Sequence, residues 1–326
     1  MKDTKAERAS QLVRLMDAWL GRVKVDEFVK LFGGTPCSEL PFSKRIDHLA
    51  DFGARTWDYR QIQSQGAARV ERWETKEDDF VRSHHREIDA LFAGSGIADE
   101  TLPEGPADVV VIFGAKAAGT FRRVQNVHDL IGRSGIWAPD RPPRIIALTG
   151  RRPLYPDETC HALPCDSSVN TEFDFMNAAL VHVFDVRSPV EGVEFGDDAE
   201  MSEMSDVRVC RFQDEHVGVI QSWEVAGSIP GRRPDTRSTF ETLVRHASFP
   251  AGSTLLFQSS HLSTLYQFLC VADLAIQHDI GIECVGCAYA DPMTPVTTHR
   301  CLQELGAQLI AMRDTYQRLD ARGWLA

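Results

Sequence analysis

The stretch Ala107-Asp108-Val109-Val110-Val111-Ile112-Phe113-Gly114 decides the fold of this chain. Its centre is a short, continuous apolar run rich in β-branched residues, which is typical of a strand buried on both faces. A glycine-containing turn over 114–120 follows it, and residues 121–131 have the pattern of a helix. The stretch therefore predicts a strand–turn–helix unit of the kind from which parallel sheets are built.

The same succession of strand, polar turn and helix recurs toward the C-terminus. We expect further strands over 144–148, 217–223, 254–258 and 280–287. Helices are expected over 171–180, from the end of the fourth strand to residue 274, and over 301–319. Strands that alternate with helices imply a parallel sheet with right-handed crossovers. The sequence thus predicts the α/β class, as a three-layer, Rossmann-like sandwich around a mainly parallel sheet.

The residues ahead of this region have a different character. Apolar residues recur with helical spacing over 5–31, and Gly33-Gly34-Thr35-Pro36 ends that pattern. Residues 37–100 are rich in charge, and we expect them to be helical, with a long surface helix over 70–92. The expected organisation is a helical N-terminal extension over 1–100 and a Rossmann-like domain over 101–326. Within that domain, the acidic stretch 186–206 is expected to be an exposed insertion.

The composition narrows the range of partners. The chain has 326 residues and a formal net charge of −12, with 43% hydrophobic and 25% charged residues, which are ordinary globular values. An acidic chain disfavours both sequence-independent nucleic-acid binding and attraction to an anionic membrane. No stretch approaches the roughly 18 apolar residues of a membrane helix, and the charged N-terminus lacks the apolar core of a signal peptide. We therefore expect a cytoplasmic protein without nucleic-acid or membrane partners.

Two turns after predicted strands have the composition of a ligand-binding edge. In the first, Gly114 allows close approach of the backbone to a ligand, and Lys116 places a cation at the strand end. In the second, Thr149, Gly150 and Arg151 combine a hydroxyl, a flexible backbone and a guanidinium that suits phosphate or carboxylate. Plain strand–helix turns are the alternative, but open α/β sheets bind their ligands where the strands end.

A third turn leads into the segment Thr236-Arg237-Ser238-Thr239-Phe240-Glu241. Backbone N–H groups and hydroxyls at a helix N-terminus form an anion site, so Thr236, Ser238 and Thr239 are candidate donors to a ligand. Glu241 is a further candidate for a polar contact with the ligand or for proton transfer. Ser238 and Glu241 also have the spacing of a capping box, which is a structural device. Both interpretations stay open, because a capped helix end can still face a ligand.

Three further side chains are candidates for proton transfer or for polar contacts with a ligand. Glu224 follows a strand that has a buried pattern, and Glu172 lies at the start of a predicted helix. His261 follows another strand, next to Ser259, which is a candidate ligand contact. The alternatives are exposed carboxylates and a histidine that merely begins a helix.

Other patterns point away from several reactions. The first turn is not a complete GxGxxG sequence and lacks the GK[ST] ending of a triphosphate-binding loop. No GxSxG sequence supports a nucleophilic serine. Cys284 and Cys287 have CxxC spacing, but because the sequence offers no second pair, we interpret them as buried structural thiols. We expect no metal site.

The order of these segments resembles the family of YdcF, SanA and ElyC over roughly residues 107–290. The resemblance rests on segments 109–114, 145–150, 172–176, the strand ending near Glu224, and segments 236–242 and 255–261. In 236–242 only Thr239 and Glu241 are the usual residue types, and no basic residue follows His261. The helical N-terminus is similar to the soluble YdcF-like branch, so the resemblance implies a Rossmann-like fold and S-adenosylmethionine as cofactor.

We therefore expect a YdcF-like enzyme that binds S-adenosylmethionine or a nucleotide-like small molecule at the strand ends. As a transferase or lyase, it would use the sulfonium as electrophile and Glu224 or His261 as base. A non-catalytic sensor or interaction protein is a second hypothesis, with the N-terminal region and the acidic stretch as partner surfaces. A phosphate-ester hydrolase is a third, although the sequence shows no compact set of metal ligands for it.

Overall fold

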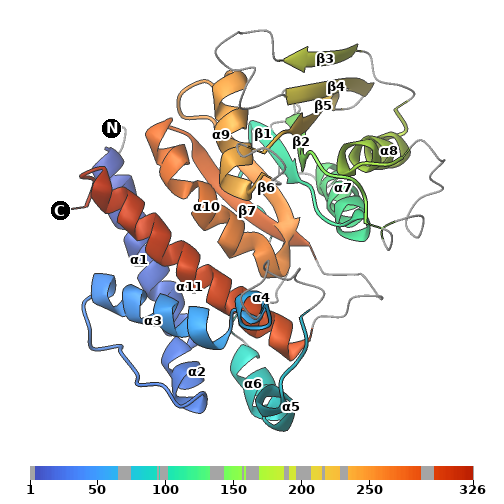
Figure 1. Ribbon diagram of the computed structural model, residues 1–326. Helices are drawn as coiled ribbons and strands as arrows, with labels where there is room; N and C mark the ends of the chain where they lie inside the picture. The colour runs from blue at the N-terminus through green and yellow to red at the C-terminus, as the bar shows by residue number, and fades with distance from the viewer. Residues whose placement is uncertain are drawn as a thin grey trace. The chain divides into compact units, whose positions relative to one another are not determined.

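The computed structural model describes residues 4–64, 75–93, 95, 102–132, 143–155, 158, 169–186, 191–195, 207–214, 217–227, 234–287 and 297–325. The chain divides into two compact units. One combines Met1–Asp99 with Pro292–Ala326, and the other is Glu100–Asp291 (Figure 1). The first unit is therefore assembled from two separate parts of the sequence, and the second lies between them in the chain.

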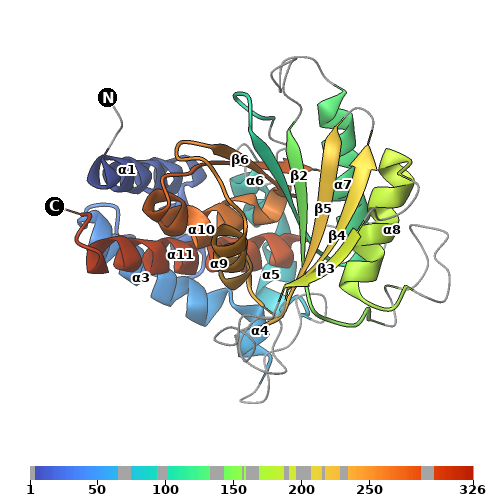
Figure 2. The same cartoon turned by 90° about the horizontal axis from the view of Figure 1, so that it is seen from above.

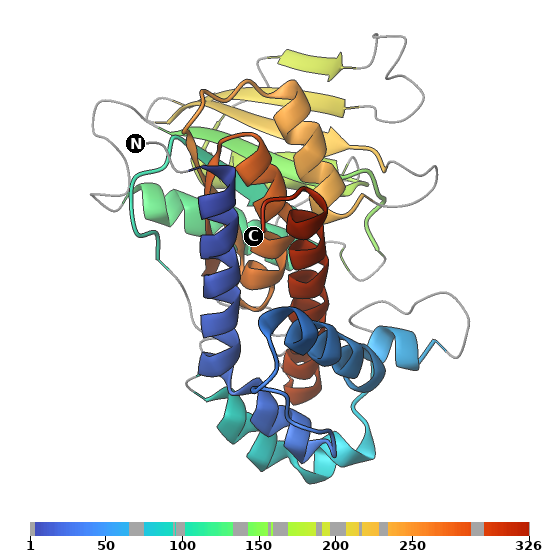
Figure 3. The ribbon, with the colours of Figure 1, turned by 90° about the vertical axis from the view of Figure 1, so that its left-hand side faces the viewer.

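The described residues of the first unit form helices. In chain order they are α1 (Lys5–Val23), α2 (Val25–Leu31), α3 (Phe42–Thr56), α4 (Tyr59–Ile62), α5 (Asp79–Ser83), α6 (His85–Phe92) and α11 (Thr298–Ala321). Helix α3 crosses α11 where Gly53 faces Gly306 (Figure 3). We expected the closing helix within the α/β domain, but the structure groups α11 with the N-terminal helices.

The long surface helix expected over 70–92 is wrong for the part that the structure describes. The chain forms two short helices there, α5 and α6, and residues 70–74 lie outside the described residues. His84 separates them with non-helical dihedral angles of φ −109° and ψ 19°. Its ring stacks on Phe80, and its Nδ1 lies 2.9 Å from the carbonyl oxygen of Phe80. The backbone N of His84 donates to the same carbonyl at 3.0 Å, so the ring adds a second contact where α5 ends.

Seven strands form one sheet in the second unit. The parallel strands are β1 (Val109–Phe113), β2 (Arg144–Gly150), β5 (Gly218–Val225), β6 (Thr254–Ser260) and β7 (Gly281–Cys287). Strands β3 (Glu191–Phe195) and β4 (Val207–Asp214) extend the sheet with antiparallel pairing. The order across the sheet is β3-β4-β5-β2-β1-β6-β7. The five parallel strands are the five that the apolar runs predict.

Helices cover both faces of this sheet. Helices α7 (Ala117–Ile131) and α8 (Glu172–Phe184) lie on one face, and α9 (Thr236–His246) and α10 (Thr264–Gln277) lie on the other (Figure 2). Alternate residues of β1 enter the two cores: Val110 and Ile112 contact the α7–α8 layer, while Val111 and Phe113 contact the α9–α10 layer. The α/β class and the three-layer architecture are confirmed.

The expected exposed insertion over 186–206 contains a strand of the sheet. Strand β3 pairs with β4, and residues 187–190 and 196–206 lie outside the described residues. Neither β3 nor β4 was predicted, because β4 does not have a continuous apolar run. Val207 and Val209 are buried, whereas Arg208 between them is partly exposed. That alternation is typical of an antiparallel strand with one buried face.

The topology brings the ends of distant segments together. Because β1, β2, β5, β6 and β7 are parallel, their carboxyl ends lie at one edge of the sheet. The chain leaves β1 toward α7 and β2 on one side, and the later strands β6 and β7 lie on the other side of β1. Among the described residues, no helix has both the length and the apolar character that crossing a membrane requires.

Candidate functional site

The carboxyl edge of the sheet gathers most of the candidate residues. Gly114 follows β1, Thr149 and Gly150 end β2, and Glu224 is the penultimate residue of β5. Thr149 and Glu224 are direct neighbours in the register of β2 and β5. On its other side, Glu224 is the neighbour of Arg208 in β4. The edge from β2 through β5 to β4 therefore carries three neighbouring polar side chains, Thr149, Glu224 and Arg208.

The carboxylate of Glu224 forms ion pairs with two arginines. Its Oε2 accepts a hydrogen bond from Arg151 Nε at 3.2 Å, and Arg208 Nη2 lies 3.3 Å from the same oxygen. The carboxylate is only 4% exposed, whereas the side chains of Arg151 and Arg208 are 44% and 38% exposed. Two accessible positive charges thus share one buried negative charge. We call Arg151, Arg208 and Glu224 the paired-arginine site.

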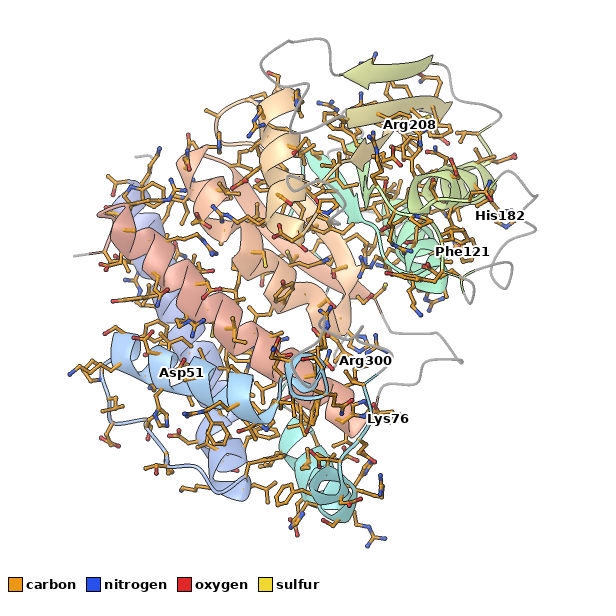
Figure 4. The ribbon with its side chains drawn as sticks, in the orientation of Figure 1. Asp51, Lys76, Phe121, His182, Arg208 and Arg300 are labelled. Carbon is orange, nitrogen blue, oxygen red and sulfur yellow. The ribbon has the colours of Figure 1, made fainter. Side chains whose placement is uncertain are left out.

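The guanidinium of Arg208 lies over the ring of Phe173. Arg208 projects from β4 on the side of the sheet where α8 lies (Figure 4), and its Cζ is 4.6 Å from the centre of the Phe173 ring. A guanidinium over an aromatic face gains a cation–π attraction and keeps its N–H edges free to bond. Since Phe173 is buried in α8, the contact fixes where the guanidinium lies.

Arg152 turns the other way and forms a buried cluster. Its Nε donates to Glu172 Oε2 at 2.7 Å, and its Nη1 and Nη2 donate to the two oxygens of Glu158 at 2.5 and 2.8 Å. Burial lowers the pKa of Arg152, but the hydrogen bonds that it donates to Glu158 and the charges of Glu172 and Glu158 outweigh this effect, so the pKa stands above its usual range. Arg152 is therefore charged at every physiological pH.

Glu158 also caps helix α7. Ala117 N donates to Glu158 Oε1 at 3.0 Å, and Tyr155 N donates to Glu158 Oε2 at 2.7 Å. The N-cap residue, Lys116, makes no side-chain capping bond of its own. Lys116 instead places its Nζ 5.8 Å from the ring of Tyr155, which also lies 4.8 Å from Arg152 Cζ. A carboxylate from a distant residue thus takes the place of a local cap.

The position between the ends of β1 and β6 is filled by Arg123 of α7. Its Nη1 donates to the carbonyl oxygens of Phe113 and Gly114 at 2.7 and 3.0 Å, and its Nε and Nη2 donate to Ser260 Oγ at 3.3 and 3.1 Å. Only 4% of Arg123 is exposed. Open α/β sheets commonly bind ligands where the strand order reverses. In this protein the side chain of Arg123 occupies that position. The partly exposed arginines, Arg151 and Arg208, lie toward β2 and β4.

The candidate bases do not meet. Glu224 lies on β5 and His261 follows β6, and β2 and β1 lie between these two strands. Three strand spacings amount to about 14 Å. His261 Nδ1 lies 3.1 Å from the carbonyl oxygen of Cys287, and Glu172 is bound to Arg152. The three candidates for proton transfer therefore belong to three separate clusters.

Two of the candidate hydroxyls bond within the sheet. Thr149 Oγ1 donates to the carbonyl oxygen of Trp223 at 3.1 Å, and Ser259 Oγ donates to that of Ser260 at 3.3 Å. Both residues are buried. Their described contacts are structural.

The segment at the start of α9 is capped three positions earlier than expected. Asp235 is the N-cap, and it exchanges hydrogen bonds with Ser238, which completes a capping box between these two residues. The predicted box of Ser238 and Glu241 is therefore wrong, because the helix begins at Thr236. Thr239 Oγ1 donates to the Asp235 carbonyl at 2.7 Å, and Glu241 pairs with Arg237 at 3.2 Å.

The two cysteines of the CxxC sequence point in opposite directions. Cys284 and Cys287 both lie in β7, and residues three apart in a strand project from opposite faces. Burial raises the pKa of Cys284 well above its usual range, so the residue stays a thiol. Among the described residues, no cluster of three histidine, cysteine or acidic side chains is placed to hold a metal ion.

Three residues of the edge were not among the predicted site residues: Arg152, Arg208 and Glu158. Arg152 lies in the predicted turn, and its neighbour Arg151 was chosen instead. Arg208 belongs to β4, so it was missed together with that strand. Glu158 lies in no recognisable pattern of the sequence.

Comparison with known proteins bears on residues ahead of the sheet. A family model described as the Rv3785 N-terminal domain matches residues 3–94, the part of the chain that contains α1 to α6. No curated protein and no solved structure matches the chain. The comparisons therefore bear on the N-terminal helices, and the argument for the edge of the sheet rests on its geometry.

Proposed function

We propose that the α/β unit binds a small molecule through a phosphate or carboxylate group at the paired-arginine site. The observation that carries this proposal is the position of Arg151 and Arg208, both more than one-third exposed and both on the same oxygen of buried Glu224. Guanidinium groups form paired, charge-assisted hydrogen bonds with planar or tetrahedral oxyanions.

The site is organised before the ligand arrives. Glu224 is fixed by the sheet, and it holds both guanidiniums at its Oε2. Phe173 supports Arg208 from α8. An arginine that is already held loses less side-chain entropy on binding than a free surface arginine. Preorganisation of this kind supports a binding role for these residues.

The ligand class that we favour is a nucleotide-like compound or S-adenosylmethionine, the class that the resemblance implies. The arginines would bind the phosphate of the former or the carboxylate of the latter. Glu224 already accepts bonds from two cations, and His261 belongs to another cluster, so a shared base for a transferase or lyase reaction has no support here. Ligand binding is the function that the geometry supports best.

The test is calorimetric titration of the full chain with ATP, S-adenosylmethionine and inorganic phosphate. Arg151→Met and Arg208→Met should each weaken binding about 10- to 100-fold, the effect of losing a hydrogen bond between charged groups. Arg245→Met is the matched control, because Arg245 is an exposed arginine in the last turn of α9. The proposal is wrong if no probe gives heat at millimolar concentration, or if the control loses as much affinity as the site variants.

A further inference from the structure

The carboxylate of Glu158 is bound in the way that a ligand anion would be. Its two oxygens accept from Arg152 Nη1 and Nη2, from Ala117 N at the start of α7, and from Tyr155 N. The side chain is 2% exposed. An arginine fork and helix N-terminal N–H groups are the donors by which proteins recognise phosphates and carboxylates.

Arg152 does not depend on Glu158 for its orientation. Its Nε edge is bound to Glu172 Oε2, and its Nη2 also donates to the carbonyl oxygen of Ala115 at 3.1 Å. Glu172 is the first residue of α8, and its backbone N donates to the Arg152 carbonyl at 3.1 Å. The Nη1–Nη2 edge would therefore keep its direction if Glu158 withdrew. Glu172 holds the arginine, and Glu158 occupies the edge that the arginine presents.

The cluster of Arg152, Glu158 and Glu172 and the paired-arginine site are built on the same two segments, the end of β2 and the start of α8. Arg151 and Arg152 are consecutive residues after β2 that bind different glutamates. Glu172 and Phe173 are consecutive residues of α8, and they contact Arg152 and Arg208 respectively. Two anion positions therefore lie on either side of the start of α8, one accessible and one occupied by the protein itself.

We infer that Glu158 is an internal occupant of a second anion position, and that an anionic group of the ligand exchanges with it. The inference rests on the proposed function, because it assumes a ligand bound at Arg151 and Arg208. It specifies a ligand with two anionic groups, of which the second binds Arg152 and Ala117 N. Glu158 then acts as a competitor that lowers the affinity of ligands too weak to displace it.

The probe for the test is inorganic pyrophosphate, with inorganic phosphate as the probe that has a single anionic centre. Glu158→Gln removes the charge of the competitor and leaves the side chain nearly the same size. An occupant that fills a position nine-tenths of the time reduces affinity about tenfold, so the variant should bind pyrophosphate about tenfold or more tightly than the unaltered protein. Binding of phosphate should change less, because it can use Arg151 and Arg208 alone.

The matched control is Asp273→Asn. Asp273 is also fully buried and paired end-on with an arginine, at 2.5 Å from Arg237 Nη1, but it lies within helix α10. This variant should leave pyrophosphate affinity unchanged. Glu158→Asp is the second variant should Glu158→Gln not fold, because its shorter carboxylate cannot span Ala117, Tyr155 and Arg152 together, and it should also bind more tightly.

The outcomes separate the two proposals. If the unaltered protein binds pyrophosphate and loses it in Arg151→Met, while Glu158→Gln and Glu158→Asp bind no more tightly, Glu158 is a structural cap and the inference is overturned. If neither the unaltered protein nor any variant binds a probe, the proposed function fails and the inference fails with it. Tighter binding in a Glu158 variant that Arg152→Met then abolishes supports the inference.

Discussion

Gly114 lies against the carboxylate of Glu172 with no room for a side chain between them. A β-carbon on Gly114 would collide with Glu172 Oε1 and would lie 3.1 Å from the carbonyl oxygen of Leu148. The carboxylate cannot easily retreat, because Arg152 holds its other oxygen at 2.7 Å. The sequence predicts that Gly114 allows a ligand to approach the backbone. In the structure, the same glycine is required because the carboxylate of Glu172 lies against it.

Gly114→Ala should lower the free energy of unfolding of the α/β unit by about 1–3 kcal/mol, the usual cost of overpacking. Urea unfolding followed by circular dichroism measures the loss. Gly132→Ala, at the end of α7, is the control, because a β-carbon there makes only ordinary contacts, the nearest at 3.6 Å from Asp129 O. Equal stability of the two variants would show that the Glu172 carboxylate moves aside.

A second glycine contact lies in the helical unit. A β-carbon on Gly306 of α11 would come within 3.2 Å of Trp57 Cβ and 3.4 Å of Gly53 O. Gly306→Ala should therefore destabilise this unit by about 1–2 kcal/mol, even though alanine favours a helix by up to about 1 kcal/mol. Gly21→Ala in α1 meets no atom within 4 Å, so it should stabilise by up to about 1 kcal/mol. Thermal melting of both variants tests this prediction. A higher melting temperature for Gly306→Ala would contradict the close contact of α11 with Trp57 and Gly53.

The helical unit should lose stability in mild acid through His299. Burial, the largest effect, lowers the pKa of His299 below its ordinary value of 6.5, and Arg300 lowers it further, while Glu77, Thr75 and Asp78 act in the opposite direction. The unfolded chain then binds a proton more readily than the folded one. Stability is therefore complete above pH 6.5 and falls as the pH drops through the lowered folded value, by at most about 1.4 kcal/mol per pH unit for one proton.

His299→Gln removes this titration. Urea unfolding at several values between pH 7.5 and pH 5 should show a shallower decline for the variant than for the unaltered protein. Parallel declines in the two proteins would mean that other groups cause the acid sensitivity. The neighbours Thr75 and Thr297, whose hydroxyls lie 3.4 and 2.9 Å from the His299 ring nitrogens, bond to glutamine as well, so the fold is preserved.

The parallel strands were predictable because continuous apolar runs in the sequence indicate strands that are buried on both faces. A strand covered on both faces has a near-continuous apolar run, and β1 is apolar and buried along its whole length. Strand β4 has a different requirement: Val209 contacts the core on one face, and Arg208 points toward Phe173 on the other. Such a strand has the composition of a polar surface segment, so the strand and its arginine were missed together.

The location of the site was predictable from the sequence, but the ion pairs within it were not. Topology alone directs Thr149, Gly150 and Glu224 to one edge. The adjacent arginines Arg151 and Arg152 are chemically identical, and the positions of their glutamate partners, Glu224 for the first and Glu158 and Glu172 for the second, decide which one is buried. Those partners are six and more residues away in the chain and belong to different elements, so no local pattern indicates them.

The dispersal of the helical unit over two parts of the sequence has a consequence for synthesis. Helices α1 to α6 leave the ribosome before the first strand is made, and α11, which crosses α3 at Gly53, is made after every other described element. The α/β unit has all its strands available earlier. The N-terminal helices can therefore complete their packing against α11 only after every strand of the α/β unit has been synthesised.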